Sequence, residues 1–383
     1  MRIAFVPAAR LLSEREPNGE ALIATSLMRA LAARGHEILA YCERSTLEPI
    51  DGVEVREVSA DGPTSGLGRL GFAKRIAADA ARERFDVAHL LFPLNTNEGY
   101  TFVNSAPLIA GPINLPWPGT SAAKPRLAAR IATTYTDRLE RRHHARTTAR
   151  AARLLVTGAS SRAAFDAEAQ DRITEIPFGV DVMRFTPAPL PGEPTILFLS
   201  VLQERKGIEV LLRAMPHVER CMPRARLVVA GSDPHGLRPR LEAMAADLGI
   251  AHLVEFAGPV APQGAPVMYA RATVVCQPSF GEPFGMTVIE AMASGRAVVG
   301  TADGGIPDAV LDGRGGRLVH AGDARLLADA LCDVLATPGA AERMGAHNRE
   351  RAETTYALWR IVDRIEDVYE QLAGDRKKTH VSS

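Results

Sequence analysis

Two glutamates, Glu282 and Glu290, stand in the segment of the chain best suited to chemistry. This segment, residues 278–295, follows an apolar run, passes through a loop containing Gly281, Pro283 and Gly285, and then opens a helical pattern near Met286. Backbone N–H groups at a helix start suit a phosphate oxygen, which can approach closely where a glycine has no side chain. Carboxylates suit sugar or ribose hydroxyls, which donate hydrogen bonds to them. The equally weighted alternative is a loop acid followed by an ordinary glutamate favoured by the helix dipole.

The elements that must position these residues follow a strand–loop–helix pattern along the whole chain. Apolar runs of four to six residues without polar alternation indicate strands buried on both faces, as in a doubly wound parallel sheet. Amphipathic helical patterns, such as 21–34 and 208–220, lie between them. The repeated order of strand and helix predicts the α/β class. The expected strands are residues 3–6, 37–41, 87–91, 107–110, 154–157, 196–200, 227–230, 253–256, 273–277 and 297–300.

A chain of 383 residues is expected to form two domains. Five of the ten residues from 185 to 194 are proline or glycine, so neither a helix nor a strand continues through them. We therefore predict an N-terminal domain over 1–185 and a C-terminal domain over 186–357. Residues 358–383 are expected to form a helix that crosses back to the N-terminal domain, followed from Gly374 by a flexible tail.

The composition narrows the class of protein. Lysine plus arginine equals aspartate plus glutamate, at 45 each, so the net charge does not favour nucleic acid. No apolar stretch approaches the ~20 residues that span a bilayer, and the apolar run at the start is too short for a signal peptide. Cys42, Cys221, Cys276 and Cys332 are scattered without a CxxC pair, so neither a disulfide nor a zinc site is expected. We expect a cytoplasmic protein.

The 278–295 segment resembles the Glu-x7-Glu signature of family 4 of the retaining glycosyltransferases, whose fold is called GT-B. Further matches follow in the right order over nearly the whole chain, so the resemblance does not depend on one motif. The resemblance implies two Rossmann-like doubly wound parallel-sheet domains that face each other across a cleft. The further matching stretches are 17–20 with 27–37, 176–181 with Phe185 and Pro187, 205–208, 300–308 and 312–323.

By this resemblance the chain moves a hexosyl-type sugar from a UDP- or GDP-linked donor to an acceptor hydroxyl, with retention of configuration. Lys206 would neutralise the departing diphosphate, because breaking the glycosyl–phosphate bond places negative charge on the leaving group. The plain alternative for Lys206 is a solvated lysine in a turn. No Asp-x-Asp triplet, which metal-dependent sugar transferases use to hold a divalent ion, occurs in the chain. We therefore expect neither a metal nor another cofactor.

The resemblance also assigns binding residues. Glu290 would bind the ribose hydroxyls, and Glu282 would contact hydroxyls of the donor sugar. Phosphate and sugar would be held by the backbone at Phe284, Gly285, Met286 and Thr287.

Three residues outside this segment are further candidates for donor binding. Gly19 would let the N-terminal backbone approach the diphosphate, with a plain turn glycine as the alternative. Ser232 and Asp233 follow another expected strand and would lie near the base or phosphate. A simple strand-to-helix turn explains those two almost as well.

The chain departs from the family at two positions. Val201 occupies the place of an arginine before the lysine, and Arg205 is the candidate to supply that charge. Ile113 occupies the place of a histidine, and His89 is the nearest titratable candidate in that half, although a structural histidine at a strand end is the favoured interpretation. Without an assisting side chain, the leaving phosphate oxygen would deprotonate the acceptor.

The acceptor is left open as a lipid-linked glycan, a polysaccharide or a small glycoside. The loops 95–100 and 111–119 are the expected acceptor contacts. Residues 124–153 hold nine lysines or arginines against two acids, so they are candidates to touch anionic lipid at the inner membrane face or a phosphorylated acceptor. A solvated arginine-rich face is the favoured alternative.

Two other functions fit parts of this pattern. A nucleotide-sugar epimerase on the same scaffold would share the donor site, but it needs acids or bases around the sugar that the N-terminal half scarcely offers. A non-catalytic protein that binds a sugar nucleotide would explain the substituted arginine and histidine positions.

Overall fold

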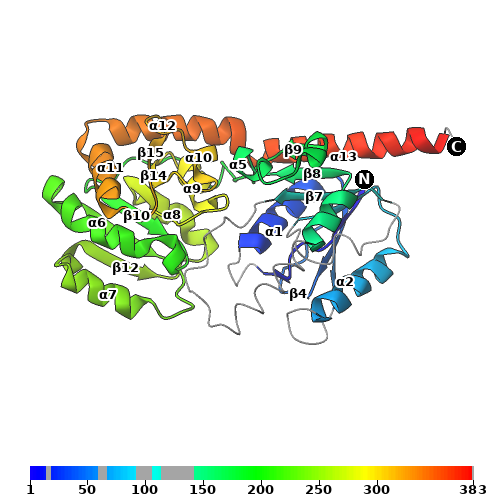
Figure 1. Cartoon of the computed structure of the whole chain (residues 1–383), viewed down its shortest axis with the longest axis horizontal. Coiled ribbons are helices and arrows are strands. Elements are labelled where there is room, and N and C mark those ends of the chain that lie inside the picture. Colours follow the sequence, from blue (N-terminus) through cyan, green and yellow to red (C-terminus); the bar gives the residue numbers. More distant parts are fainter. Residues whose placement is uncertain (14–18, 59–66, 92–105, 114–141, 382–383) are drawn as a thin grey trace. The chain divides into compact units, whose positions relative to one another are not determined.

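The computed structural model describes residues 1–13, 19–58, 67–91, 106–113 and 142–381. The chain divides into two compact units, which Figure 1 shows coloured along the sequence. Unit 1 comprises Met1–Asn114, Ala123–Gly179 and Leu358–Ser383. Unit 2 comprises Leu115–Ala122 and Val180–Ala357. The last helix of the chain therefore belongs with the N-terminal residues.

Unit 1 contains a seven-stranded sheet in the order β5-β3-β1-β6-β7-β8-β9, in which every pairing is parallel. A separate pair of two-residue strands, β2 and β4, is also parallel. The strands are β1 Arg2–Phe5, β2 Leu11–Leu12, β3 Glu37–Cys42, β4 Arg44–Ser45, β5 Val53–Glu57, β6 Val87–Leu90, β7 Leu108–Ile113, β8 Arg153–Val156 and β9 Ile173–Glu175.

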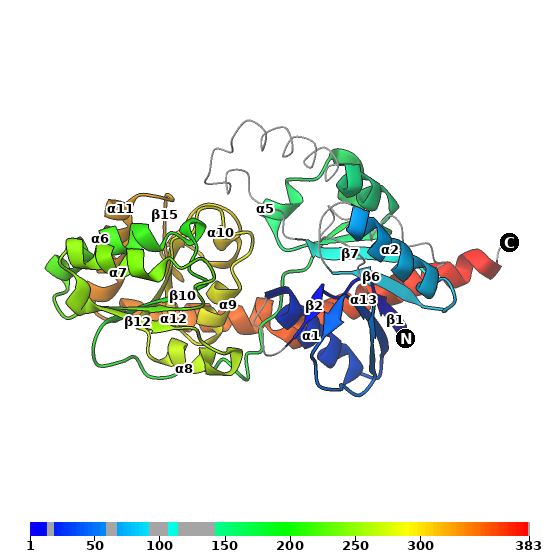
Figure 2. The ribbon, with the colours of Figure 1, turned by 90° about the horizontal axis from the view of Figure 1, so that it is seen from below.

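The helices of unit 1 include α13, which lies beside the sheet in Figures 1 and 2. Its apolar residues, among them Ile361, Val362 and Ile365, join one buried core with Ile3 and Phe5 of β1. The helices of this unit include α1 Gly19–Ala32, α2 Leu67–Ala80, α5 Ala159–Arg162, a 3-10 turn Ala167–Arg172 and α13 Leu358–Val381.

α13 continues from Gly374 as far as Val381, within the segment that the sequence analysis expected to be a flexible tail. The polar residues there, including Arg376 and Lys377, are good helix formers, and each extends the helical hydrogen-bond ladder. None of the helices in the described part of the chain is both long and apolar enough to cross a bilayer.

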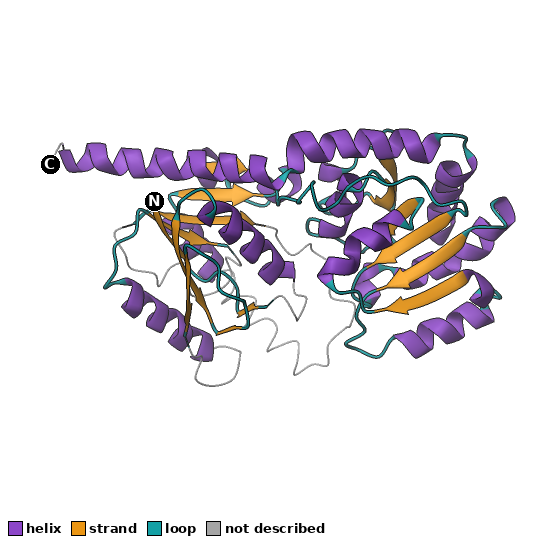
Figure 3. Cartoon of the chain, turned by 180° about the vertical axis from the view of Figure 1, so that it is seen from behind, coloured by secondary structure: helices purple, strands orange, loops and turns teal. Residues whose placement is uncertain are grey.

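Unit 2 contains a six-stranded parallel sheet in the order β12-β11-β10-β13-β14-β15. Figure 3 shows its strands with helices on both sides, so the strands are buried on both faces. Ile196, Phe198, Val274 and Val299 are among the sheet residues in its core. The strands are β10 Thr195–Leu199, β11 Arg226–Ala230, β12 Val254–Gly258, β13 Val274–Gln277, β14 Ala297–Thr301 and β15 Gly316–Val319.

The helices of unit 2 alternate with its strands, as the apolar pattern predicts. A π-helical turn, Ala352–Tyr356, follows the last helix of unit 2, and the chain then returns to unit 1. The helices are α6 Ile208–Cys221, α7 Arg238–Asp247, α8 Ala265–Ala270, α9 Met286–Ala293, α10 Ile306–Ala309, α11 Ala324–Ala336 and α12 Ala340–Arg351, with 3-10 turns at Glu204–Lys206, Ala251–Leu253 and Pro262–Gly264.

The predicted α/β class with two doubly wound parallel sheets is confirmed, and each of the ten expected strands is present. The strands β5, β9 and β15 and the two-residue strands β2 and β4 were not predicted from the sequence. β5, Val53–Glu57, and β9, Ile173–Glu175, are edge strands, and neither is fully buried. Because an edge strand exposes one side, its sequence mixes charged residues with apolar ones and loses the continuous apolar run of a central strand.

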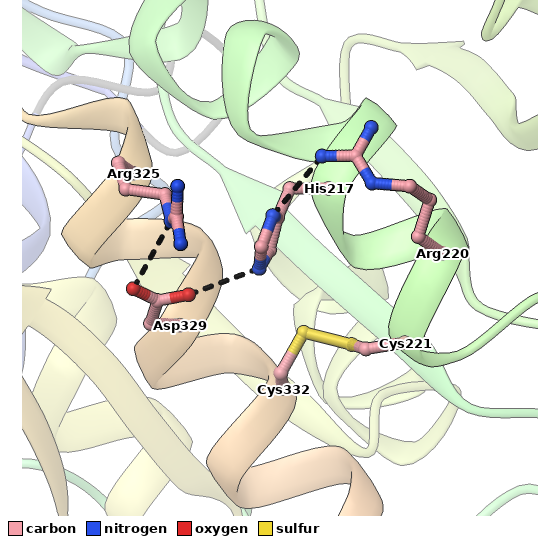
Figure 4. Close-up of a disulfide and its surroundings, with 6 residues drawn as sticks. All are labelled: His217, Arg220, Cys221, Arg325, Asp329 and Cys332. Atoms are coloured by element: carbon pink, nitrogen blue, oxygen red, sulfur yellow. Dashed lines mark hydrogen bonds and ion pairs between the residues drawn. A yellow bond between two sulfur atoms is a disulfide. The ribbon is translucent and has the colours of Figure 1, made fainter.

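The expectation that the chain forms no disulfide is wrong. Cys221, the last residue of α6, and Cys332 of α11 are joined by a disulfide across 111 positions of sequence. Figure 4 shows that the same two helices are also linked by polar side chains, with His217 Nε2 2.9 Å from Asp329 Oδ1. The two helices pack against each other in the core of unit 2, and this tertiary contact brings together cysteines that sequence spacing leaves unpaired. Cys42 and Cys276 are free and buried.

We predict that replacing Cys221 and Cys332 with serine lowers the free energy of unfolding by about 2–4 kcal/mol, because a cross-link over a long segment restricts the unfolded chain. Urea unfolding with and without reductant measures this, and reductant should affect the wild type but not the variant. Wild-type protein unfolded without reductant should expose two thiols, and four after reduction. Four thiols before reduction would contradict the pairing.

Candidate functional site

The candidate site lies where the strand order of unit 2 reverses. β11 and β12 extend the sheet on one side of β10, whereas β13, β14 and β15 extend it on the other. The loops that leave the carboxyl ends of β10 and β13 therefore diverge, and parallel α/β sheets bind ligands at such a point. The loop after β10 carries Lys206, and the loop after β13 carries Glu282.

Lys206 ends a 3-10 turn that is packed directly onto the loop after β13. Gly207 follows it in a left-handed conformation, with φ of 73°. A Cβ atom at Gly207 would lie 1.9 Å from the carbonyl oxygen of Pro278, so no other residue fits there without displacing the loop. The backbone N–H of Phe280 also donates to the carbonyl of Arg205 at 2.8 Å. These contacts fix the position from which the lysine side chain extends.

The backbone around Glu282 is held from the opposite side by the loop after β14. The N–H of Gly305 donates to the carbonyl of Glu282 at 2.7 Å, and a Cβ atom at Gly304 would lie only 2.2 Å from that carbonyl oxygen. Thr301 Oγ1 donates to the carbonyl of Ser279 at 2.7 Å. The loops after β10, β13 and β14 thus form one hydrogen-bonded layer at the carboxyl edge of the sheet.

Lys206 and Glu282 form an ion pair within this layer. Lys206 Nζ lies 2.6 Å from Glu282 Oε2, and the two side chains are 12% and 10% exposed. Ser279 Oγ donates to the same oxygen at 3.1 Å, and Gln277 Nε2 lies 3.4 Å from it. At this burial the pair is weakly screened by solvent, and removing one partner would leave a charge in a largely closed environment.

Helix α9 begins directly after this pair. Its N-cap, Gly285, has φ of 90°, and Thr287 Oγ1 in the first turn donates to the carbonyl of Leu199 at the end of β10. The first amides of a helix have no intrahelical acceptor, so the α9 N-terminus offers N–H groups and a partial positive charge. At the other end Arg349 Nη1 donates to the carbonyl of Ala293 at 2.6 Å, which suits the negative end of the helix dipole.

Glu290 lies on α9 and is anchored by a tyrosine. Tyr269 of α8 donates its hydroxyl to Glu290 Oε2 at 2.7 Å. Burial raises the pKa of Glu290 to about 7, although the Tyr269 hydrogen bond and the charge of Arg184 act in the opposite direction. The carboxyl group is therefore protonated in part of the molecules near neutral pH, unlike an exposed glutamate.

The surroundings of His89 are those of a structural histidine at a strand end. It is fully buried in unit 1, its Nδ1 lies 2.5 Å from the hydroxyl of Tyr369 on α13, and its Nε2 lies 2.5 Å from the carbonyl of Gly111. Its ring stacks on Phe5. Burial lowers the pKa of His89 to about 4, so the imidazole is neutral at physiological pH. With both nitrogens engaged and no solvent contact, the ring cannot reach an acceptor as it stands.

The other predicted residues lie as follows. Arg205, adjacent to Lys206, directs its Nε to Gln203 Oε1 at 3.2 Å. Asp233 accepts from the N–H groups of Leu237 and Arg238 at the start of α7, and these bonds lower its pKa. Its carboxylate thus caps a strand-to-helix turn, which was the alternative interpretation.

Gly19 begins α1 of unit 1, and Ser232 lies in the turn after β11, where its carbonyl accepts from the N–H of Leu202. Phe284 is buried, and its ring lies edge-on to that of Tyr356. This contact anchors the loop between β13 and α9. Met286 is the first residue of α9.

The sequence analysis missed Tyr269, Gln277 and Ser279. Tyr269 comes from α8, and no motif connects it with Glu290. Gln277 and Ser279 did carry a signal, since each places a polar group at the end of a strand that is otherwise apolar. Such residues at the carboxyl end of a parallel strand are candidates for a site on that ground alone.

Several predicted regions lie outside the described residues: the acceptor loop 95–100, residues 114–119 of the second acceptor loop, and 124–141 of the basic stretch. Within the described part, no group of three or more His, Cys, Asp or Glu side chains is arranged to hold a metal ion.

Comparison with known proteins finds similarity to sugar transferases. The family described as "Glycosyl transferases group 1" matches residues 193–337. The GDP-mannose-dependent alpha-(1-6)-phosphatidylinositol monomannoside mannosyltransferase of Mycolicibacterium smegmatis is 33% identical over 54% of this chain and 57% of its own length. The D-inositol 3-phosphate glycosyltransferase of Corynebacterium diphtheriae is 29% identical over 96% of this chain and 94% of its own. The alignment thus spans little more than half of the first relative.

The fold is shared with a solved structure. Sucrose-phosphate synthase from Thermosynechococcus elongatus superposes with a TM-score of 0.80, covers 98% of this chain and 99% of its own, and is 24% identical. This similarity identifies the fold as GT-B.

We predict that Lys206 and Glu282 stabilise the unliganded protein jointly. In a double-mutant cycle of Lys206→Met and Glu282→Gln, followed by urea unfolding, the coupling free energy should be about 1–3 kcal/mol, because the two charges share a nearly closed site. The exposed i,i+4 pair Arg238–Glu242 is the matched control and should couple by less than about 0.5 kcal/mol. Equal coupling in the two pairs would show that the site pair is an ordinary surface contact.

Proposed function

We propose that this chain transfers a hexosyl sugar from a nucleoside diphosphate donor to an acceptor hydroxyl, in keeping with the match of residues 193–337 to the glycosyl transferases group 1 family. The observation that carries the proposal is the Lys206–Glu282 pair beside the N-terminus of α9, at the reversal of strand order in unit 2. A cation and free amides suit a diphosphate, and nearby carboxylates suit the hydroxyls on either side of it.

In this proposal the donor spans the α9 N-terminus. The diphosphate lies against the first amides of α9 at 285–287 and close to Lys206. Glu290 accepts hydrogen bonds from the ribose hydroxyls, and Glu282 accepts them from the sugar. The anchoring of each carboxylate by protein donors, Tyr269 for Glu290 and Ser279 for Glu282, supports these roles, because an oriented acceptor needs little rearrangement when a ligand arrives.

The chemical step follows from the charge distribution. As the glycosyl–phosphate bond breaks, negative charge grows on the diphosphate, and Lys206 together with the α9 amides stabilises it without a metal ion. The acceptor attacks from the face that the diphosphate leaves and gives its proton to the leaving phosphate oxygen, so the configuration is retained. The burial of His89, with both nitrogens engaged, supports a route that needs no histidine base.

Donor and acceptor are proposed from the named relatives. One relative is named for GDP-mannose, so GDP-mannose is the first donor to test, with UDP-glucose as the alternative. The acceptors in the names of both relatives contain an inositol that carries a phosphate or a phosphatidyl group. We therefore place a cyclitol phosphate or its lipid among the acceptors of this chain.

We propose a cytoplasmic location, with contact to the inner membrane face through the basic residues 124–153 when the acceptor is a lipid. The Cys221–Cys332 disulfide gives this location a direct test, since cytosolic glutathione keeps most thiols reduced. Alkylation of thiols at the moment of cell lysis reports the state of the pair. A fully oxidised pair in the cell would place the protein in an oxidising compartment instead.

We predict that the donor raises the unfolding temperature of the protein more than other sugar nucleotides do. At 100 times its dissociation constant a ligand adds about 2.7 kcal/mol, which corresponds to about 5–10 °C for a unit of this size. A thermal-shift panel of GDP, UDP, GDP-mannose and UDP-glucose measures this. If none of the four stabilises the protein, the nucleotide-sugar proposal fails.

With that donor, Lys206→Ala and Glu282→Ala should each lower kcat at least about 100-fold, because the leaving charge and the sugar lose their partners. Arg213→Ala removes an exposed cation of α6 and should leave kcat unchanged. Wild-type turnover in both site variants would refute the assignment. An epimerised sugar nucleotide, formed from donor alone, would favour the epimerase.

We also predict that nucleotide affinity depends on the ionisation of Glu290. Because the pKa of Glu290 in the folded protein is about 7, above its ordinary value, the neutral form is favoured as pH falls. A carboxylate that must accept two hydroxyl donors then binds about tenfold more weakly at pH 6 than at pH 8. Calorimetry measures the dissociation constant of the same nucleoside diphosphate for the wild type and for Glu290→Gln at each pH. The ratio of the two constants cancels the effect of protonation of the ligand itself. Parallel pH profiles for the two proteins would exclude Glu290 as the titrating group.

A further inference from the structure

Within the described part of the chain, the donors to the carboxylate of Glu282 converge on one of its two oxygens. Lys206 Nζ, Ser279 Oγ and Gln277 Nε2 lie 2.6, 3.1 and 3.4 Å from Oε2. Among the described residues no hydrogen bond reaches Oε1, and this atom is not sealed from solvent. The carboxylate is therefore anchored through one oxygen and open through the other.

Gln277 and Ser279 form a directional chain of hydrogen bonds. Gln277 Nε2 donates to Ser279 Oγ at 2.7 Å, so the Ser279 hydroxyl proton is free to point at Glu282 Oε2. Turning the Gln277 amide over would place its oxygen against the carboxylate, which repels it. The charge of Glu282 thus selects the amide orientation, and the amide in turn orients the serine.

This arrangement has a cost that packing does not explain. Gln277 is 1% exposed at the end of β13, and its Oε1 is buried without a hydrogen-bond partner in the described part of the chain. A buried acceptor with no partner is destabilising, and an apolar residue would fill the same space without that cost. Among the described residues, the Gln277 amide interacts only with the Ser279 hydroxyl and the Glu282 carboxylate.

We propose that Gln277 and Ser279 are positioning residues that hold Oε2 of Glu282 and so reserve Oε1 for a hydroxyl of the donor sugar. The inference rests on the proposed transferase function and extends it to two residues with no contact to substrate of their own. When the diphosphate draws Lys206 toward itself, these two neutral donors keep the carboxylate in place. The sugar would then meet an acceptor whose direction is already set.

The test compares Ser279→Ala and Gln277→Met with the wild type, using GDP-mannose or UDP-glucose, whichever the wild type turns over. Each variant should lower kcat about 10- to 100-fold, since an error of about 1 Å in a substrate contact costs that much. The dissociation constant of the free nucleoside diphosphate should stay within about twofold, because it lacks the sugar that Glu282 contacts. Ser279→Thr, which restores the hydroxyl, should recover most of the lost kcat.

Ser294→Ala is the matched control, because it removes another buried serine hydroxyl from unit 2 that has no hydrogen-bond partner among the described residues. Its kcat should equal that of the wild type. A wild-type kcat in Ser279→Ala or Gln277→Met overturns the role of that residue, and so does a loss of nucleoside diphosphate affinity that parallels the loss of kcat. A wild type that turns over neither donor refutes the proposed function itself, whereas an active wild type with unaffected variants refutes only this inference.

Discussion

The ion pair between Lys206 and Glu282 is the interaction on which the rest of the site depends. It joins the loops after β10 and β13, which leave the sheet where the strand order reverses and would otherwise diverge. A lysine and a glutamate at 12% and 10% exposure are stable there only because each is paired and the carboxylate has further donors. The backbone is arranged to keep them together, with glycine at 207 and 304 where a side chain would collide with the neighbouring loop.

An ion pair of this kind stabilises the site before a ligand binds. Without a ligand, each charge satisfies the other. In the proposed function a diphosphate would offer Lys206 a stronger partner, and Glu282 would keep its contacts with Ser279 and Gln277 and gain the incoming hydroxyl. Glu290 differs: within the described residues it forms no ion pair, burial raises its pKa to about 7, and Tyr269 supplies a hydrogen bond. The two glutamates of one motif are thus kept ready by different physical means.

The remainder of unit 2 supports the strand edge and helix α9. Arg349 binds the carbonyls of Val182, Phe185 and Ala293, so one guanidinium ties the entering chain to the C-terminus of α9. The disulfide joins α6 to α11, two helices that pack in the same core as β10. In unit 1, the ring of His89 connects β6 to α13 through the hydroxyl of Tyr369.

The sequence by itself determined the α/β class, the central strands and the segment 278–295, because buried parallel strands are continuous apolar runs and a glycine loop before a helix is a local pattern. Edge strands such as β5 escaped it, since their half-exposed sequences mix charge with apolar residues. Only the tertiary structure decided that Lys206 meets Glu282 across 76 positions, that Tyr269 meets Glu290, and that Cys221 meets Cys332. Such contacts form when loops and helices that are far apart in the sequence pack against each other. The spacing of residues along the chain does not show which of these elements will be neighbours.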